Sequence, residues 1–290
     1  MITSRQPAVP AAVAAHYDGL DAYYRSLWGE HVHHGLWSGP ADRAPVEIAT
    51  RGLAEYVIAL ARIEPGDRVV DVGCGYGATS RLLAREHGAR VTGLTLSAAQ
   101  AAYAVSVGGR PGDPEILVRD WRENGLPDGE ADAVVAIECL SHMPDKPRVF
   151  AELARVLKPG ARLVLTDWLA CEQRRPWRDR ALLRPICDEG RLPSMHTAAE
   201  YGELLTGAGF ELLRFEDLSR RVSRTWPIIV RRALARALRD PEARRFLLDR
   251  GNPDRIFALT VPRLMAAYAT RAMVQGLFVA QRTGAAGGGR

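Results

Sequence analysis

Residues 69–100 read VVDVGCGYGATSRLLAREHGARVTGLTLSAAQ, and this stretch decides the fold. Its first four residues form an apolar, β-branched run that is typical of a strand buried on both faces. Gly73, Gly75 and Gly77 come next, followed by a helical pattern and by a second extended run over 91–96. The order of strand, glycine turn, helix and strand predicts one βαβ unit. Its glycines permit positive φ and let a ligand approach the backbone where the helix begins.

The composition favours one large domain, or one domain with an elaborated cap, because 290 residues with 47% hydrophobic content can build a full-sized core. No run of about 18 apolar residues occurs, so we expect no stable membrane insertion. The N-terminus lacks the apolar core of a secretory signal. The four cysteines are scattered, which favours reduced thiols and a cytoplasmic protein.

The formal net charge is +5, and arginines are concentrated between residues 220 and 245. Apolar residues alternate with these arginines in a helical rhythm, which favours a solvated helix face over a nucleic-acid surface. We therefore expect no nucleic-acid partner, and an oligomer is possible.

The spacing of the glycine turn separates it from the turn of dinucleotide enzymes. Asp71 stands two residues before the first glycine, giving D-x-G-C-G-x-G, whereas the dinucleotide pattern is G-x-G-x-x-G. The spacing resembles motif I of class I S-adenosylmethionine-dependent methyltransferases. That resemblance implies a Rossmann-like α/β fold, with a seven-stranded, mainly parallel sheet and helices on both faces. It also implies S-adenosylmethionine as cofactor, S-adenosylhomocysteine as product, and cofactor contacts from Asp71, Gly73, Cys74, Gly75 and Gly77.

The end of the second strand departs from the general class I pattern. Many members carry an acidic residue there for the ribose hydroxyls, but this chain has Thr95, Leu96 and Ser97. The pattern G-x-T-L-S-x-x-Q resembles a variant in tocopherol, cyclopropane-forming and related small-molecule methyltransferases. This resemblance implies that Thr95, Leu96 and Gln100 contact the cofactor.

A third strand over 116–118 leads to Asp120 and Trp121. The resembled fold places an acidic residue on the adenine amino group and an apolar neighbour against the ring. Asp120 can accept that hydrogen bond and Trp121 offers a stacking face. The alternative is an exposed turn aspartate beside a core tryptophan.

A fourth strand over 131–137 ends in Ile137, a further cofactor candidate, and is followed by Glu138 and His142. A fifth strand over 162–168 brings Asp167 to the same edge, where ligands bind in open α/β sheets. The passage E-x-x-x-H-M-P-D-K resembles the γ-tocopherol methyltransferase group and its natural-product relatives.

Two chemistries are compatible with these residues. For a hydroxyl acceptor, His142 would act as general base and Asp167 would orient it. Sugar O-methyltransferases that resemble this chain imply the same roles, although they have a second histidine where Ser141 stands here. For an alkene acceptor, Glu138 would stabilise and deprotonate a carbocation, with Tyr23 and Trp168 as ring partners. Glu138 alternatively has a structural or cofactor-binding role.

An aromatic helical segment precedes the βαβ unit. Tyr17, Tyr24 and Trp28 recur at helical spacing and are candidates for a lid over the positively charged sulfonium, with plain core as the alternative. His31, His33 and His34 follow; we favour structural or substrate-contact roles over a metal site, and we expect no metal.

The predicted organisation is a lid over 1–45, a cofactor-binding core over 46–170 and a cap insertion over 171–196. The rest of the core covers 197–282, with a sixth strand from Gly209 to Asp217 and a helical stretch from about Pro253 to Val279. Residues 283–290 are expected to be a flexible tail.

These features predict methyl transfer to a small, largely apolar specialised metabolite, at carbon or oxygen. Prenyl or terpenoid compounds, phenols, glycosides and polyketides are the candidate acceptors. The alternatives are a non-catalytic binding protein with the same fold and, with less support, a macromolecular methyltransferase. A dinucleotide-dependent oxidoreductase is disfavoured by the glycine spacing.

Overall fold

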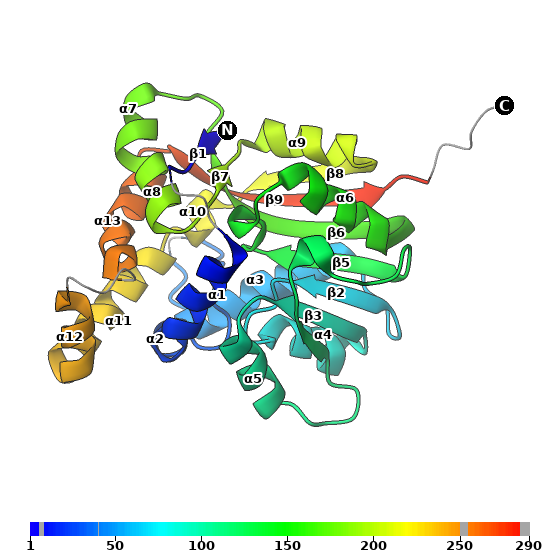
Figure 1. Cartoon of the computed structure of the whole chain (residues 1–290), viewed down its shortest axis with the longest axis horizontal. Helices are drawn as coiled ribbons and strands as arrows, with labels where there is room; N and C mark the ends of the chain where they lie inside the picture. The colour runs from blue at the N-terminus through cyan, green and yellow to red at the C-terminus, as the bar shows by residue number, and fades with distance from the viewer. Residues whose placement is uncertain (6–8, 40, 250–254, 285–290) are drawn as a thin grey trace.

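The computed structural model describes residues 1–5, 9–39, 41–249 and 255–284. Its centre is a seven-stranded sheet in the order β4-β3-β2-β5-β6-β9-β8 (Figure 1). Strand β9 runs antiparallel to both of its neighbours, and the other pairs are parallel. The strands are β2 (Arg68–Val72), β3 (Arg90–Thr95), β4 (Glu115–Val118), β5 (Ala131–Ile137), β6 (Leu157–Ala170), β8 (Phe210–Asp217) and β9 (Met273–Arg282). The predicted Rossmann-like fold is therefore confirmed.

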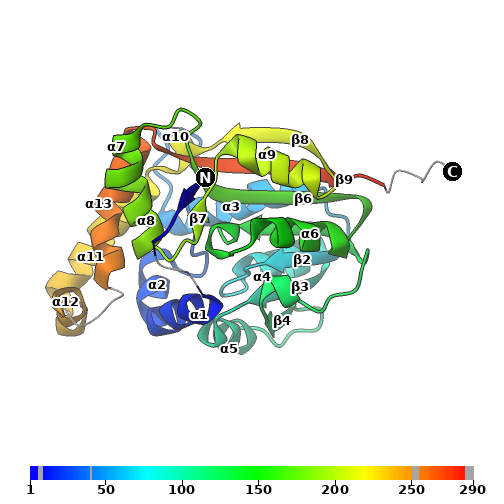
Figure 2. The same cartoon turned by 45° about the horizontal axis from the view of Figure 1, so that its top comes forward.

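Helices cover both faces of the sheet (Figure 2). Helices α3 (Val46–Ala61) and α4 (Ala78–His87) pack in one apolar core, whereas α6 (Lys146–Val156) and α9 (Ala198–Gly207) pack in a second. Helix α5 (Ala98–Ser106) lies along β3 and β4. Residues of β6 alternate between the two cores, as the pleat of a strand requires.

The predicted helical stretch from Pro253 to Val279 is wrong in its second half. Helix α13 (Arg255–Ala269) ends before Arg271, which adopts a left-handed φ of +54°, and β9 begins at Met273. Strand β9 is buried along most of its length between β6 and β8. Its run of apolar residues over 277–280 suits a fully buried strand, which periodicity alone does not separate from a buried helix.

The remaining elements gather beside the carboxyl ends of the parallel strands. They are α1 (Pro10–Gly19), α2 (Asp21–Trp28), α7 (Pro176–Arg178), a π-helical turn (Asp179–Leu183), α8 (Arg184–Glu189), α10 (Ser219–Val222), α11 (Thr225–Arg239) and α12 (Pro241–Leu248). A two-stranded sheet pairs β1 (Ile2–Thr3) with β7 (Ser194–Met195), which ties the N-terminus to the segment predicted as a cap. Figures 1 and 2 show α7, α8, α11 and α13 together at one end of the molecule. The divisions drawn from the sequence stay predictions, and residues 285–290 of the predicted tail lie outside the described residues.

Two further properties bear on the site. Strand β2 pairs with β3 on one side and β5 on the other, so the strand order reverses there and opens a crevice at the carboxyl ends. Within the part of the chain that the structure describes, no helix is long and apolar enough to cross a membrane.

Candidate functional site: a cofactor cleft joined to an aromatic chamber

The three glycines after β2 have left-handed φ angles, but their structural roles differ. A Cβ at Gly73 (φ +70°) would lie 2.3 Å from the Cβ of Cys139, so this glycine permits close packing of two strand ends. A Cβ at Gly75 (φ +54°) would meet only Gln100 Nε2, at 4.0 Å, so its missing side chain leaves open space. At Gly77 (φ +68°) a Cβ would meet Ala104 at 3.1 Å. Gly77 therefore shapes the start of α4.

A cleft opens beside this turn, and the space between its lining atoms, open solvent included, is about 1060 Å³. It is bordered by these predicted cofactor residues: Asp71, Gly73, Cys74, Gly75, Thr95, Leu96, Gln100, Asp120, Trp121 and Ile137. Gly77 is outside the lining, because it faces Ala104 and Arg81 instead. The structure thus brings together residues from the ends of β2, β3, β4 and β5, and the predicted cofactor contact of Gly77 stays a prediction.

Asp71 provides a buried carboxylate at the floor of the cleft. It is 2% exposed and accepts a hydrogen bond from Ser80 Oγ at 2.6 Å. Burial raises the pKa of Asp71 to about 7, although the hydrogen bond from Ser80 acts in the opposite direction. A positively charged ligand group would favour the ionised carboxylate.

Thr95 and Gln100 form one polar unit at the end of β3. Thr95 Oγ1 donates to Gln100 Oε1 at 2.9 Å and accepts from the backbone N–H of Ser97 at 3.2 Å. Because the amide oxygen of Gln100 is held by Thr95, the Nε2 donors lie toward Gly75 and the cleft. This arrangement can offer hydrogen-bond donors to a ligand at the glycine turn.

Asp120 and Trp121 border the cleft but are already engaged. The Asp120 carboxylate pairs with Arg122 at 2.6 Å and accepts from the Arg122 backbone N–H at 2.9 Å, which caps the 3₁₀ turn Trp121–Glu123. Trp121 is 2% exposed and donates from Nε1 to the Val149 carbonyl at 3.1 Å. A ligand at Asp120 would therefore share this carboxylate with Arg122, and Trp121 is a core side chain that also borders the cleft.

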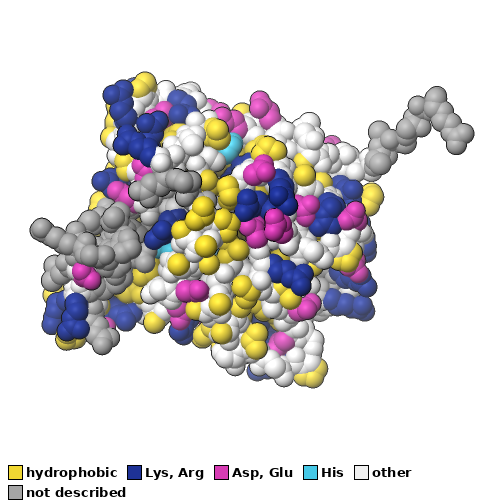
Figure 3. Space-filling model, in the orientation of Figure 1, with side chains coloured by type: hydrophobic (Ala, Val, Ile, Leu, Met, Phe, Trp, Pro, Cys, Tyr) yellow, Lys and Arg dark blue, Asp and Glu magenta, His cyan; other side chains and the backbone are white. Residues whose placement is uncertain are grey.

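Helices α1 and α2 form hydrogen bonds with residues at the rim of the cleft. Asp18 accepts hydrogen bonds from Ser97 Oγ at 2.5 Å and from the Ala99 backbone N–H at 3.1 Å. Tyr76 in the glycine turn donates to the Asp21 carbonyl at 3.0 Å. Figure 3 shows hydrophobic side chains gathered near the centre of this face of the molecule, over α1. The predicted lid thus has direct bonds to the elements it would cover.

A second cavity adjoins the cleft, and the space between its lining atoms, open solvent included, is about 560 Å³; we call it the aromatic chamber. Its lining consists of His16, Tyr17, Tyr24, Trp28, Val32, His33, His34, Glu138, His142, Trp168, Gly190, Thr225 and Trp226. Trp226 meets Trp28 and Trp168 edge to face, with ring centroids 6.1 Å and 5.8 Å apart. Four of the residues predicted as lid residues or ring partners line this chamber: Tyr17, Tyr24, Trp28 and Trp168.

Tyr23 is the exception among them. Its ring lies under the Arg236 guanidinium, 5.5 Å from ring centroid to the Arg236 Cζ, and it is outside the lining of the chamber. On helix α2 it is adjacent to Tyr24, and neighbouring helical residues point in different directions. The predicted role of Tyr23 beside the reacting atoms is therefore corrected.

Five residues border both cavities and mark their junction: Tyr17, Val32, His33, Glu138 and His142. Glu138 has a left-handed φ of +53° and a carboxylate that accepts from four donors. These are the His34 backbone N–H (3.1 Å), His34 Nδ1 (2.8 Å), Trp168 Nε1 (3.1 Å) and Gln275 Nε2 (3.1 Å). Burial opposes ionisation, but His34, His33 and the hydrogen bond from Trp168 lower the pKa of Glu138. Glu138 is therefore ionised, and both of its carboxylate oxygens already accept hydrogen bonds.

His142 lies at the junction with its Nε2 3.2 Å from the Tyr17 hydroxyl. Burial lowers the pKa of His142 to about 4, so its ring is neutral near pH 7. His142 belongs to the turn Leu140–His142. Lys146 stabilises this turn, because its Nζ donates a hydrogen bond to the Leu140 carbonyl at 2.7 Å. Lys146 is 3% exposed. The lysine of H-M-P-D-K thus positions this turn, a role that the sequence did not reveal.

Asp167 does not orient His142. It accepts hydrogen bonds from the Tyr201 hydroxyl at 2.5 Å and from the Trp168 backbone N–H at 2.9 Å. Successive side chains of a strand lie on opposite faces of the sheet. Because Trp168 faces the chamber, Asp167 faces the core formed with α6 and α9. Burial raises the pKa of Asp167 to about 6. The predicted pair of His142 and Asp167 is therefore corrected.

Residues 46–214 match the family described as "Methyltransferase domain". A probable tocopherol O-methyltransferase, chloroplastic, of Oryza sativa subsp. japonica is 33% identical over 79% of this chain and 67% of that protein. The 27-O-demethylrifamycin SV methyltransferase of Amycolatopsis mediterranei (strain S699) is 32% identical over 75% of this chain and 80% of its own length.

Solved structures also resemble the whole chain. The (4+2)-cyclase SpnF superposes with a TM-score of 0.81 and 25% identity, covering 98% of this chain and 99% of its own. The cyclopropane synthase MmaA2 from Mycobacterium tuberculosis superposes with a TM-score of 0.82 and 21% identity over 96% of this chain and 100% of its own. The latter likeness concerns the fold alone.

Proposed function

The chain belongs to the methyltransferase family that its residues 46–214 match and is a class I S-adenosylmethionine-dependent methyltransferase, and we propose that its acceptor is a small, largely apolar, uncharged specialised metabolite. The cofactor would occupy the cleft and the acceptor the aromatic chamber. The observation that carries this proposal is the junction, where five side chains border both cavities. A methyl group can pass between two ligands only where they meet in line.

The residues of the cleft suit this cofactor. Gly75 leaves space against the backbone, and Asp71 can pair with an ammonium group while Gln100 Nε2 donates. When bound, S-adenosylmethionine supplies an electrophilic methyl group on a positively charged sulfur. Tyr17, at the junction, presents an aromatic ring of the kind that stabilises a neighbouring cation.

The chamber favours a neutral acceptor over an anionic one. Three tryptophans and two tyrosines supply apolar walls that exclude water and pack against flat or aliphatic groups. The ionised Glu138 at the junction would repel a carboxylate or phosphate. Trp226 Nε1 is buried with no hydrogen-bond partner among the described residues, so it can donate to an oxygen of the acceptor.

These features also rank the candidate acceptors. A phenol, a polyketide aglycone or a prenyl alcohol would fit the walls and the charge better than a prenyl diphosphate. Geranyl diphosphate, which a structural neighbour binds in its crystal structure, is therefore a useful negative control. A cytoplasmic location stays a prediction, since two of the relatives are named chloroplastic.

The test has two parts. Calorimetric titration with S-adenosylhomocysteine should give micromolar affinity. Transfer of tritium from the labelled methyl group of S-adenosylmethionine should then label tocopherol, 2-naphthol or geraniol, but not geranyl diphosphate. Binding without transfer to any compound would favour a non-methylating role, such as the activity for which SpnF is named. Absence of binding would contradict the assignment of the cleft.

A further inference from the structure

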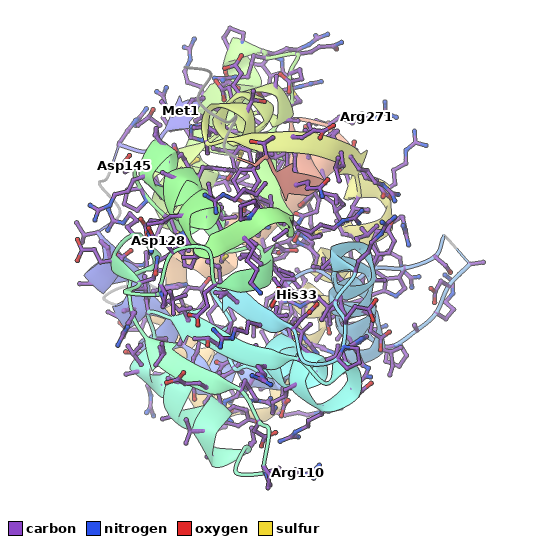
Figure 4. The ribbon with its side chains drawn as sticks, turned by 90° about the vertical axis from the view of Figure 1, so that its right-hand side faces the viewer. Met1, His33, Arg110, Asp128, Asp145 and Arg271 are labelled. Atoms are coloured by element: carbon purple, nitrogen blue, oxygen red, sulfur yellow. The ribbon has the colours of Figure 1, made fainter. Side chains whose placement is uncertain are left out.

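We propose that His33 is the general base of this enzyme and that the methylated atom is a hydroxyl oxygen whose proton passes to His33 Nε2. This inference rests on the proposed function and specifies the chemistry at the junction. His33 is 9% exposed and borders both the cleft and the chamber. In Figure 4 it lies near the middle of the molecule, whereas Arg110 and Arg271 are at the periphery.

The other junction residues are less suited to accept a proton. Val32 has no polar side-chain atom. His142 Nε2 lies 3.2 Å from the Tyr17 hydroxyl, and we assign Nε2 as the acceptor of that hydroxyl. Nδ1 of the neutral His142 ring then carries the hydrogen and cannot accept a proton, although it too is buried with no hydrogen-bond partner among the described residues. Glu138 is ionised, yet its two oxygens already accept from four donors. A carboxylate bound in this way gains little by taking a further proton.

The tautomer of His33 follows from the hydrogen bond of its Nδ1. Its Nδ1 lies 2.9 Å from the backbone carbonyl of His34. Because a carbonyl oxygen only accepts, Nδ1 must carry the hydrogen, and Nε2 of the neutral ring is left with a free lone pair. His33 Nε2 is buried and has no hydrogen-bond partner among the residues that the structure describes. A buried acceptor without a partner requires an explanation, and a substrate hydroxyl supplies one.

The surrounding charges suit a base that is neutral at rest. Burial lowers the pKa of His33, and the neighbouring His34 acts in the same direction, while Glu138 and the His34 carbonyl raise it. The His31 ring lies 5.3 Å from the His33 ring, centroid to centroid. Glu138 therefore stands where it can stabilise the imidazolium that forms when the proton arrives.

The hydroxyl oxygen forms a bond to the methyl carbon, and the carbon–sulfur bond breaks with its electron pair left on sulfur, giving S-adenosylhomocysteine. The hydroxyl proton passes to His33 Nε2, and the imidazolium releases it to solvent when the products leave. Oxygen thus enters as a hydroxyl and leaves as a methyl ether.

The decisive variant is His33→Asn, because the asparagine amide keeps a donor for the His34 carbonyl but has no basic nitrogen. With 2-naphthol or tocopherol as acceptor, turnover should fall about 100-fold or more, as expected for loss of a general base. Affinity for S-adenosylhomocysteine should stay within about twofold, since proton transfer takes no part in binding. His87→Asn, at the end of α4 and outside both linings, is the matched control and should behave as wild type.

Three results would overturn the inference. His33→Asn could turn over hydroxyl acceptors like wild type, or His142→Asn could show the large loss instead. The wild-type enzyme could also methylate the geraniol double bond and leave hydroxyl groups untouched. In each case methyl transfer itself persists, so the proposed function would stand while the role of His33 would fall.

A second measurement needs no acceptor. Nuclear magnetic resonance of the S-adenosylhomocysteine complex with isotope-labelled histidine reports which ring nitrogen carries hydrogen. We expect His33 to be neutral and protonated at Nδ1 near neutral pH. A ring protonated at Nε2, or a charged ring, would overturn the proposal, because neither can accept the proton.

Discussion

The cofactor cleft and the aromatic chamber are assembled in different ways. Most of the cleft comes from the carboxyl ends of consecutive strands and the turns after them, within residues 71–144. The chamber combines residues 16–34 with Glu138 and His142 after β5, Trp168 of β6, Gly190 after α8, and Thr225 and Trp226 of α11. The cleft therefore depends on local backbone geometry, and the chamber depends on packing between distant segments. Acceptor specificity can change at the chamber while the cofactor site stays intact.

The largest effect should come from filling the cleft. Gly75→Val places branched carbons where the missing side chain leaves space, so affinity for S-adenosylhomocysteine should fall at least about 100-fold, as steric exclusion from a close backbone approach predicts. Gly129→Val is the matched control, because Gly129 has a similar φ of +59° with nothing within 4 Å of its Cβ position. Calorimetry on both variants separates backbone strain from loss of space; equal losses would refute the cleft.

The second-largest effect should be a loss of stability in Glu138→Gln at the junction. The new amide group would face donors that now point at a carboxylate, leaving at least one of them unsatisfied. We expect a loss of about 1–3 kcal/mol in the free energy of unfolding, measured by urea denaturation. Glu211→Gln, on the exposed side of β8, should change stability little. Unchanged stability in Glu138→Gln would mean that its four hydrogen bonds do not hold the segments together.

Cofactor affinity should depend on pH through Asp71. Its pKa is raised to about 7, so the carboxylate is ionised above that pH and loses its charge as the pH falls. Affinity for S-adenosylhomocysteine should weaken by up to about tenfold per pH unit below 7, until the pKa of the complex is reached. Titrations across this range with wild type and Asp71→Asn check the effect. A flat profile in wild type would show that Asp71 does not pair with the cofactor ammonium.

The smallest predicted effect is on the chamber alone. Trp226→Phe removes the unpartnered indole N–H and some apolar surface, so KM for 2-naphthol should rise about fivefold, a loss of about 1 kcal/mol. Affinity for S-adenosylhomocysteine should not change. Trp177→Phe, at a residue that is 53% exposed in α7, is the control. If cofactor affinity fell with Trp226→Phe, the two cavities would not act separately.

The same contrast explains what the sequence could predict. The cleft can be predicted from the sequence because Asp71, Gly75 and Thr95 stand at fixed offsets from a strand, and neighbouring strands end at one edge of the sheet. The predicted role of Asp167 beside His142 is wrong because the position of a residue at the end of a strand does not show which face of the sheet its side chain is on. The alternation of Asp167 and Trp168, already present in the sequence, separates the two faces.

The remaining differences lie outside the reach of local patterns. Trp226 enters the chamber through the packing of α11 against α2, which no spacing in the sequence reveals. The apolar run of β9 is compatible with a helix until its neighbours β6 and β8 are known. Tyr23 and Tyr24 share one helical segment, and only the tertiary structure shows which ring faces the chamber. The sequence shows His33 only as one of three clustered histidines, whereas the tertiary structure shows that its Nε2 has no hydrogen-bond partner among the described residues.

Titration with S-adenosylhomocysteine followed by nuclear magnetic resonance tests the division of the site most directly. The account predicts that the backbone amide signals of Gly73, Gly75 and Thr95 shift on binding, while the Trp226 indole N–H signal stays in place until 2-naphthol is added. Shifts at Trp226 without shifts at Gly75, or the absence of any shift, would contradict a methyltransferase that binds its cofactor at the glycine turn and its acceptor in the aromatic chamber.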